Sequence, residues 1–144
     1  MTVKRLLQDK GSFVSIIDPD VRVQDVMDQL ERDEVSALVV SRDKRTVLGI
    51  ISGGDVVRGL NRIGPEVANR PVRDLMTTDV VCCDIGEPMQ KIYELMDTHQ
   101  IRHVPVIENG QLCGIISMLD VVKYRLGEIE AEAEALKEYV AGRT

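Results

Sequence analysis

Two short segments each place an aspartate three residues after a serine: Ser52 with Asp55, and Ser117 with Asp120. A serine directly before a helix can cap it, with its hydroxyl accepting a backbone N–H while the carboxylate lies in the first turn. The same groups suit a nucleotide, because a helix N-terminus attracts phosphate and a carboxylate accepts hydrogen bonds from ribose hydroxyls. The spacing alone leaves both interpretations open.

The two segments belong to an internal repeat. Residues 49–57 (GIISGGDVV) and 114–122 (GIISMLDVV) agree at 7 of 9 positions, and residues 3–7 are matched by 72–76. Each copy continues through a short apolar run, an amphipathic helix, two strands joined by a turn, and a helix that starts at the serine. A unit of this size buries too little surface alone, so two units are expected to pack together.

This pattern predicts an α/β protein, more narrowly α+β, with two β-α-β-β-α repeats packed as a pseudo-twofold module and a C-terminal helix. The expected boundaries are residues 3–60 for the first repeat with a lead-in helix, and 61–71 for a linker containing two prolines. The second repeat is expected over residues 72–126, and a helical extension over 127–142.

The C-terminal segment carries apolar residues at alternating steps of four and three, which is a heptad pattern. They are Val122, Leu126, Ile129, Ala133, Leu136 and Val140. Because this stripe is too short for an isolated coiled coil, it must pack against its own module or another subunit, and we expect the latter. Four nearby glutamates are interpreted as a solvated helix face rather than a partner surface.

Composition excludes several classes of protein. The net charge is −6 and aromatic residues make up 3% of the chain, which argues against a nucleic-acid-binding face. No apolar run approaches the roughly 20 residues needed to span a bilayer, and no signal peptide is recognisable, so a cytoplasmic protein without membrane partners is expected. No nucleophile–base pair or Walker loop is visible, which predicts a protein without enzymatic activity.

The cysteines and histidines do not form a metal-binding pattern. Cys82, Cys83 and Cys113 are an odd number without framework spacing, and are interpreted as small buried residues in a reducing compartment. His99 and His103 do not complete the four-ligand set that zinc requires. No metal is therefore expected.

The two G-h-h-S-x-x-D-h-h segments (h, apolar), together with VRDLMT at 72–77 and RHVPV at 102–106, resemble the tandem cystathionine-β-synthase (CBS) domain pair, or Bateman module. The resemblance covers residues 3–126 and implies a stand-alone pair without an attached catalytic domain. It implies a homodimeric sensor that binds AMP, ADP, ATP or possibly NAD, needs no other cofactor, and acts on an unidentified protein target. The alternative is a structural adaptor in which the clefts stay empty and the serine–aspartate pairs only cap helices.

The resemblance also implies which residues bind the nucleotide. The serines and aspartates would contact phosphate and ribose in two clefts, four residues would line the base pocket, and a cationic pair would contact phosphate. These residues are Ser52, Asp55, Ser117 and Asp120; Ile17, Asp18, Cys83 and Asp84; and Arg102 and His103.

The two clefts are predicted to be unequal. The pseudo-twofold is expected to bring Arg102 and His103 to the Ser52–Asp55 cleft, whereas the matching residues of the first repeat, Ser36 and Ala37, carry no charge. Many relatives have a charged pair between the serine and the aspartate, often with an arginine. Here Gly-Gly replaces this pair in one repeat and Met-Leu in the other, so both clefts are expected to lack the contribution of that arginine to affinity.

Overall fold

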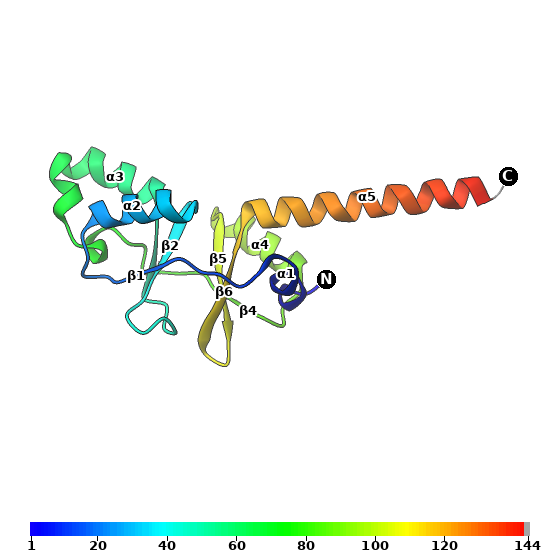
Figure 1. Cartoon of the computed structure of the whole chain (residues 1–144), viewed down its shortest axis with the longest axis horizontal. Coiled ribbons are helices and arrows are strands. Elements are labelled where there is room, and N and C mark those ends of the chain that lie inside the picture. The colour runs from blue at the N-terminus through cyan, green and yellow to red at the C-terminus, as the bar shows by residue number, and fades with distance from the viewer. Residues whose placement is uncertain (143–144) are drawn as a thin grey trace.

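The computed structural model describes residues 1–142, which form a two-lobed body and one long projecting helix (Figure 1). In chain order the elements are α1 Val3–Lys10, β1 Ile16–Ile17, α2 Val23–Asp33, β2 Ala37–Val40, β3 Gly49–Ser52, α3 Gly53–Ile63, β4 Cys83–Asp84, α4 Met89–His99, β5 His103–Glu108, β6 Gln111–Ser117 and α5 Met118–Gly142. Two short 3-10 helices, η1 Pro65–Asn69 and η2 Val72–Asp74, lie between α3 and β4.

The two sheets have the same topology, which confirms the predicted α+β fold with two repeats. In each sheet the first strand runs parallel to the second and the second antiparallel to the third, in the orders β1-β2-β3 and β4-β5-β6. The β5–β6 turn is Asn109-Gly110, and both residues have positive φ, as a tight two-residue hairpin requires. The pairing aligns Ala37 with Ser52, and His103 with Ser117, so each serine lies beside the start of a central strand.

The repeat against which a segment packs is not always the one that it precedes in the chain. Helix α1, expected to lead into the first repeat, lies in the hydrophobic core of the second, where Val3, Leu6 and Leu7 are buried. Its backbone is joined to that repeat by the Val3 N–H, which donates to the Glu87 carbonyl at 2.9 Å. The reason is that α1 ends at Gly11 and an extended segment then leads to the first sheet.

The equivalent segment before the second repeat is exchanged in the same way. Val72 and Leu75 lie in the core of the first repeat, and the Val72 N–H donates to the Val21 carbonyl at 2.8 Å. Part of the expected linker joins this core as well, since Val67 of η1 is buried there. Each repeat therefore depends on residues that precede the other repeat in the chain.

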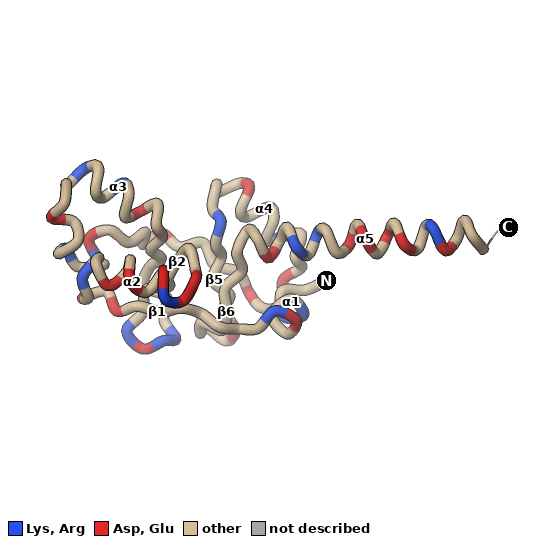
Figure 2. The backbone as a smooth tube through the Cα atoms, turned by 45° about the horizontal axis from the view of Figure 1, so that its top comes forward, with Lys and Arg blue, Asp and Glu red and all other residues tan. Residues whose placement is uncertain are grey.

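Helix α5 combines the last helix of the second repeat and the expected extension into one continuous helix. Its first turns pack on the body, and residues 129–142 are exposed along their whole length. Residues of both charge signs follow one another along it (Figure 2). Among residues 1–142, no helix has the length and apolar character required to cross a membrane.

Candidate functional site

A cavity of about 840 Å³ opens between the two repeats, within the range typical of small-molecule sites. Four pieces of chain form its walls: the end of α1 with the segment after it, the start of β2, the start of β5, and the start of α5. They meet because β1 and β2 are parallel, while each third strand returns antiparallel to the same end of its sheet. The cavity therefore lies where the first residues of β2 and β5 meet the N-terminus of α5.

Ser117 and Asp120 lie on the wall of this cavity and form a helix cap. The Ser117 N–H donates to Asp120 Oδ2 at 2.8 Å, and the Asp120 N–H donates to Ser117 Oγ at 3.2 Å. Lys10 Nζ, at the end of α1, lies 3.3 Å from Asp120 Oδ2. The carboxylate is therefore oriented by its own helix and paired with a cation from a distant part of the chain.

Ser52 and Asp55 make the same cap at the start of α3 but lie outside this cavity. The Ser52 N–H donates to Asp55 Oδ2 at 2.9 Å. Here the cation comes from the same helix, because Arg58 donates to Asp55 Oδ1 at 2.6 Å. The two pairs are thus alike in backbone geometry and differ in the origin of the cation and in their access to the cavity.

Arg102 and His103 lie on the wall of the Ser117–Asp120 cavity, whereas the sequence interpretation expected them at the Ser52–Asp55 cleft. The physical reason is the β5–β6 register, which sets His103 directly opposite Ser117. The His103 Nε2 atom also lies 2.7 Å from Ser36 Oγ, so the start of β5 contacts the residue just before β2.

The environment of His103 favours the neutral imidazole. Burial lowers its pKa from the usual 6.5, and the nearby Arg102 charge lowers it further, while Asp120 opposes the shift. Because the unfolded state then binds a proton more readily than the folded state, stability is retained above pH 6.5 and lost as the pH falls through the folded pKa.

This shift predicts a pH-dependent contribution to stability. We expect His103→Gln to reduce the loss of melting temperature between pH 7.5 and pH 5.5, since glutamine keeps a polar group beside Ser36 but cannot titrate. Thermal denaturation of both proteins at the two pH values measures this difference. His99→Gln, at the exposed end of α4, is the matched control and should behave as the wild type. Equal losses for His103→Gln and wild type would show that this residue does not couple to folding.

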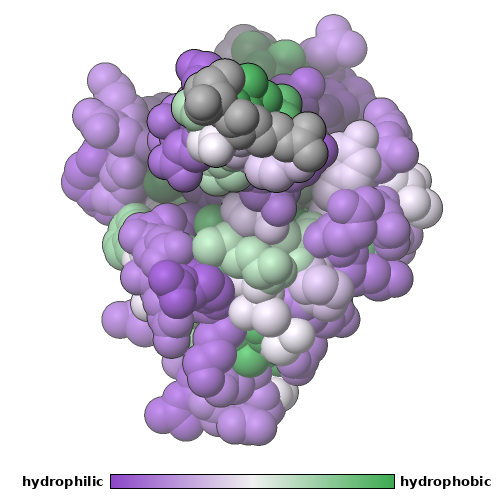
Figure 3. Space-filling view, turned by 90° about the vertical axis from the view of Figure 1, so that its right-hand side faces the viewer, coloured by the Kyte–Doolittle hydropathy of each residue, from purple (hydrophilic) through white to green (hydrophobic). Residues whose placement is uncertain are grey.

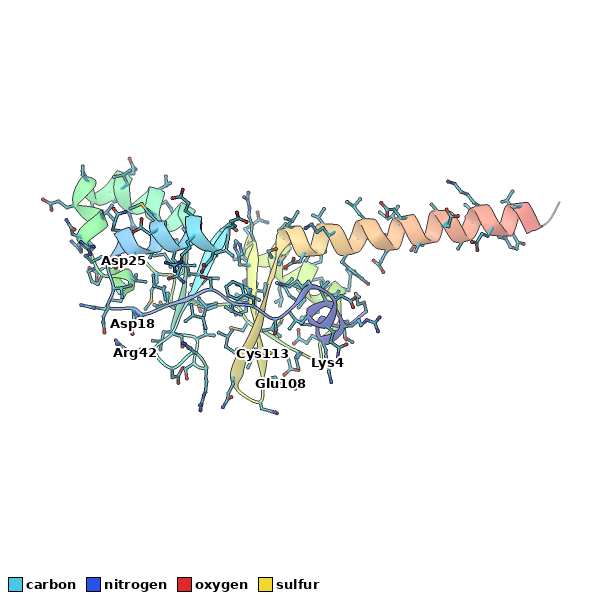
Figure 4. All side chains as sticks on the ribbon, viewed as in Figure 1. Lys4, Asp18, Asp25, Arg42, Glu108 and Cys113 are labelled. Atoms are coloured by element: carbon cyan, nitrogen blue, oxygen red, sulfur yellow. The ribbon has the colours of Figure 1, made fainter. Side chains whose placement is uncertain are left out.

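The four residues expected to line the base pocket do not line this cavity. Ile17 and Cys83 are buried in the two cores, and burial raises the pKa of the Cys83 thiol to about 12. Asp18 lies 3.8 Å from Arg42 on the body surface (Figure 4). Asp84 accepts a hydrogen bond from the Gly86 N–H. The reason is strand direction: these residues are at the ends of β1 and β4, whereas the cavity lies at the start of β1.

Lys10 and Phe13, which had no role in the sequence interpretation, also line the cavity. Phe13 is the only phenylalanine of the chain and is 66% exposed, which is unusual for so large an apolar side chain. Its position in the polar segment after Gly11 was the available signal. Lys10 offered none, because its proximity to Asp120 arises only from the packing of α1 on the second repeat.

The cavity combines three kinds of binding group. Lys10 and Arg102 supply positive charge, the Ser117–Asp120 cap supplies hydroxyl and carboxylate oxygens, and Phe13 supplies an aromatic surface. Such a set suits a ligand with a flat apolar part, hydroxyl groups and an anionic part. Across residues 1–142, histidine, cysteine and acidic side chains form no group of three that would hold a metal ion.

Residues 12–62 and 72–127 match the family described as CBS domain. The chain is 28% identical over 127 residues to the mitochondrial CBS domain-containing protein CBSX3 of Arabidopsis thaliana. This match covers 85% of the chain and 62% of CBSX3, so the chain spans less than two thirds of that relative's length.

Solved structures share the fold. The CBS-domain containing protein ATU1752 of Agrobacterium tumefaciens is 38% identical, superposes with a TM-score of 0.83, and covers 87% of this chain and 99% of its own. The CBS domain pair of protein MJ0100, solved with 5′-methylthioadenosine and S-adenosyl-L-methionine, has a TM-score of 0.79 at 19% identity. That match covers 89% of this chain and 98% of the other, and its identity is low enough that it supports the fold alone.

Proposed function

The chain belongs to the CBS domain family, and on this premise we propose that it is a non-enzymatic regulatory protein that binds an adenosine ligand between its two repeats. The observation that carries the proposal is the cavity in which the N-terminus of α5, two cations and an exposed aromatic side chain meet. A helix N-terminus with nearby cations favours an anion, and the aromatic surface favours a base.

Each residue has a proposed role. Asp120 would accept hydrogen bonds from the ribose hydroxyls, and Ser117 with the first backbone N–H groups of α5 would contact phosphate. Lys10, now paired with Asp120, would turn to the phosphate together with Arg102. Phe13 would stack on the adenine, because its exposed ring lies at the same cavity.

The proposed ligands are AMP, ADP, ATP and NAD. Lys10 and Arg102 favour ligands with phosphate, whereas Glu34 and Asp120 on the same cavity keep the site from being strongly cationic. The ligands of the MJ0100 structure, which carry adenosine without phosphate, define the other class to be tested.

Ligand binding is expected to raise the melting temperature. A ligand at a hundred times its dissociation constant adds about 2.7 kcal/mol of stability, which corresponds to roughly 5–10 °C for a chain of this size. Thermal-shift measurements with AMP, ADP, ATP, NAD and S-adenosylmethionine at millimolar concentrations test this. Inorganic phosphate at the same concentration is the control for general anion stabilisation. An unchanged melt with all five ligands would exclude the sensor function.

A structural adaptor remains the second candidate, and one observation favours it. Both serine–aspartate pairs form complete caps with cationic partners, so their polar groups are satisfied without any ligand. In that case the family motif serves only to start α3 and α5. The thermal-shift experiment separates the two functions, because an adaptor without a ligand gives no shift.

The acting unit of the proposed sensor is a homodimer that contacts an unidentified protein target. Support for the dimer comes from the exposed apolar side chains of α5. Support for a regulated contact comes from continuity: the same helix carries Asp120 at one end and reaches Gly142 at the other. A ligand held at the start of α5 would therefore be linked rigidly to its far end.

A further inference from the structure

Helix α5 keeps one apolar stripe in contact with solvent. Six large side chains of the stripe each remain 44% to 62% exposed: Leu119, Val122, Leu126, Ile129, Leu136 and Val140. Together with Ala133 they are spaced alternately three and four residues apart. The stripe therefore begins at Leu119, one apolar position before Val122, where the sequence pattern placed its start. Hydrophobic side chains are visible among hydrophilic ones on the end of the molecule that carries α5 (Figure 3).

The opposite face of α5 packs on the body. Val121 is buried at 7% exposure, and Tyr124 and Glu128 are half-buried. At 100° per residue these three side chains point well away from the stripe. The body therefore covers one side of the helix. Leu119 and Val122 also line the cavity described above, whereas the stripe from Leu126 to Val140 lies beyond it and is open to another molecule.

We propose that the stripe packs against α5 of a second copy of this chain in a parallel two-stranded coiled coil. This inference rests on the homodimer proposed above but does not depend on a ligand. Each stripe residue from Leu126 to Val140 would meet the same residue of the partner. Because the body packs on Val121, Tyr124 and Glu128, it stays outside the seam that Leu126 to Val140 would form.

The charges beside the stripe support the parallel orientation. In a parallel coiled coil, a residue directly before an apolar position such as Leu126 or Ala133 lies beside the residue five places later in the partner's sequence. Arg125 would then lie beside Glu130, and Glu132 beside Lys137, so both contacts join opposite charges and both occur twice. Charged residues on both flanks also keep the stripe narrow, as a two-stranded seam requires.

Antiparallel pairings fit less well. The register that pairs Val140 with Val122 sets Glu132 beside Glu132 and Lys123 beside Lys137, so like charges meet. Two registers lie one heptad away, and both restore opposite charges. One leaves Val140 without a layer and extends the partner's last turn past the start of α5, where the body lies. The other pairs Val140 with Ile129 and keeps only four apolar layers, fewer than the parallel coiled coil.

The ion pairs within the helix permit the proposed contact. Arg125 now lies 3.1 Å from Glu128, and Tyr124 donates to the other oxygen of the same carboxylate at 2.8 Å. When Arg125 turns to the partner, Glu128 keeps the tyrosine hydroxyl. The exchange of one exposed ion pair for another therefore costs little.

Disulfide trapping of the full chain tests the orientation. We expect Val140→Cys to form an intermolecular disulfide under mild oxidation, because the two copies of residue 140 would face each other in the seam. Glu138→Cys, in the same turn but on the outer face, is the matched control and should stay monomeric on a non-reducing gel. The wild type reports any background from its three native cysteines.

Several outcomes would overturn the proposal. If sedimentation shows a dimer but Val140→Cys does not form a disulfide, the orientation is wrong, since antiparallel copies of residue 140 lie more than about 15 Å apart. A dimer in which Val140→Cys and Glu138→Cys form disulfides equally has no defined seam and likewise contradicts the parallel coiled coil. A wild type that sediments as a monomer at tens of micromolar excludes both the coiled coil and the homodimer, whatever the ligand result.

Charge reversal gives an independent measurement that needs no cysteine. Glu132→Lys should raise the dimer dissociation constant about tenfold, because two attractive contacts become repulsive. Adding Lys137→Glu should restore most of the affinity by reversing the partner residue as well. A double variant no tighter than the single one would contradict the parallel pairing.

Discussion

Replacing Asp120 by alanine is expected to weaken binding of an adenosine nucleotide by about a hundredfold, whereas Asp55→Ala leaves it almost unchanged. Hydrogen bonds to a charged acceptor are each worth about 1.5–3 kcal/mol, and displacing Lys10 offsets part of that gain. Titration of AMP into the two variants by calorimetry measures the difference. The asymmetry follows from the cavity, which includes Asp120 and not Asp55.

The two variants are well matched, since each removes the carboxylate of the same type of helix cap. Both should lose a similar stability of about 0.5–1 kcal/mol, so a general folding defect cannot imitate the difference in affinity. Arg102→Ala should resemble Asp120→Ala in direction, with a weaker dependence of binding on salt. If Asp55→Ala abolishes AMP binding and Asp120→Ala does not, the cavity described above is not the nucleotide site.

Leu7→Ala is expected to destabilise the protein by about 2–5 kcal/mol, a large part of the total for a domain of this size. Leu7 is 6% exposed and lies in the core of the second repeat, although it precedes the first. Urea denaturation of the full chain measures the loss. Gln8→Ala, the exposed neighbouring residue of α1, should change stability by less than about 0.5 kcal/mol.

A double-mutant cycle tests which repeat α1 supports. A Cβ on Gly114 would lie 2.7 Å from a Leu7 methyl group, whereas one on Gly49 would meet Met76 instead. Gly114→Ala and Leu7→Ala should therefore couple by about 0.5–3 kcal/mol, because the smaller residue relieves the clash. Gly49→Ala and Leu7→Ala should be additive. Coupling to Gly49 instead would place α1 in the first repeat, as chain order suggested.

Much of the fold could be predicted because it depends on local patterns. Duplication of GIIS followed by an aspartate marked both third strands and both final helices, and Asn109-Gly110 marked the hairpin. The exchange of α1 between repeats had no such signal. Residues 3–7 are compatible with either core, because the pattern of an amphipathic helix shows that one face is buried but not which partner covers it.

The site could be predicted only in part for a similar reason. The serine–aspartate spacing indicated two helix caps, and the structure contains both. Asp120 lies on the cavity wall and pairs with Lys10, which α1 brings from the other end of the chain, whereas Asp55 lies outside the cavity and pairs with Arg58 of its own helix. The residues expected to line the base pocket lie at the ends of β1 and β4 rather than at the cavity. The reason is that strand direction decides which end of an apolar run faces the cavity.

The sequence by itself determined the two repeats, the order of their elements, the capped starts of α3 and α5, and the apolar stripe of α5. These features rest on residues a few positions apart, whose interactions are set by helix and strand periodicity. The tertiary structure alone decided the exchange of α1 and η2, the contact of Ser36 with His103, and the union of Lys10, Phe13, Arg102 and Asp120 around one cavity. Their positions depend on how two cores pack together, because residues far apart in the chain meet only after both repeats have folded.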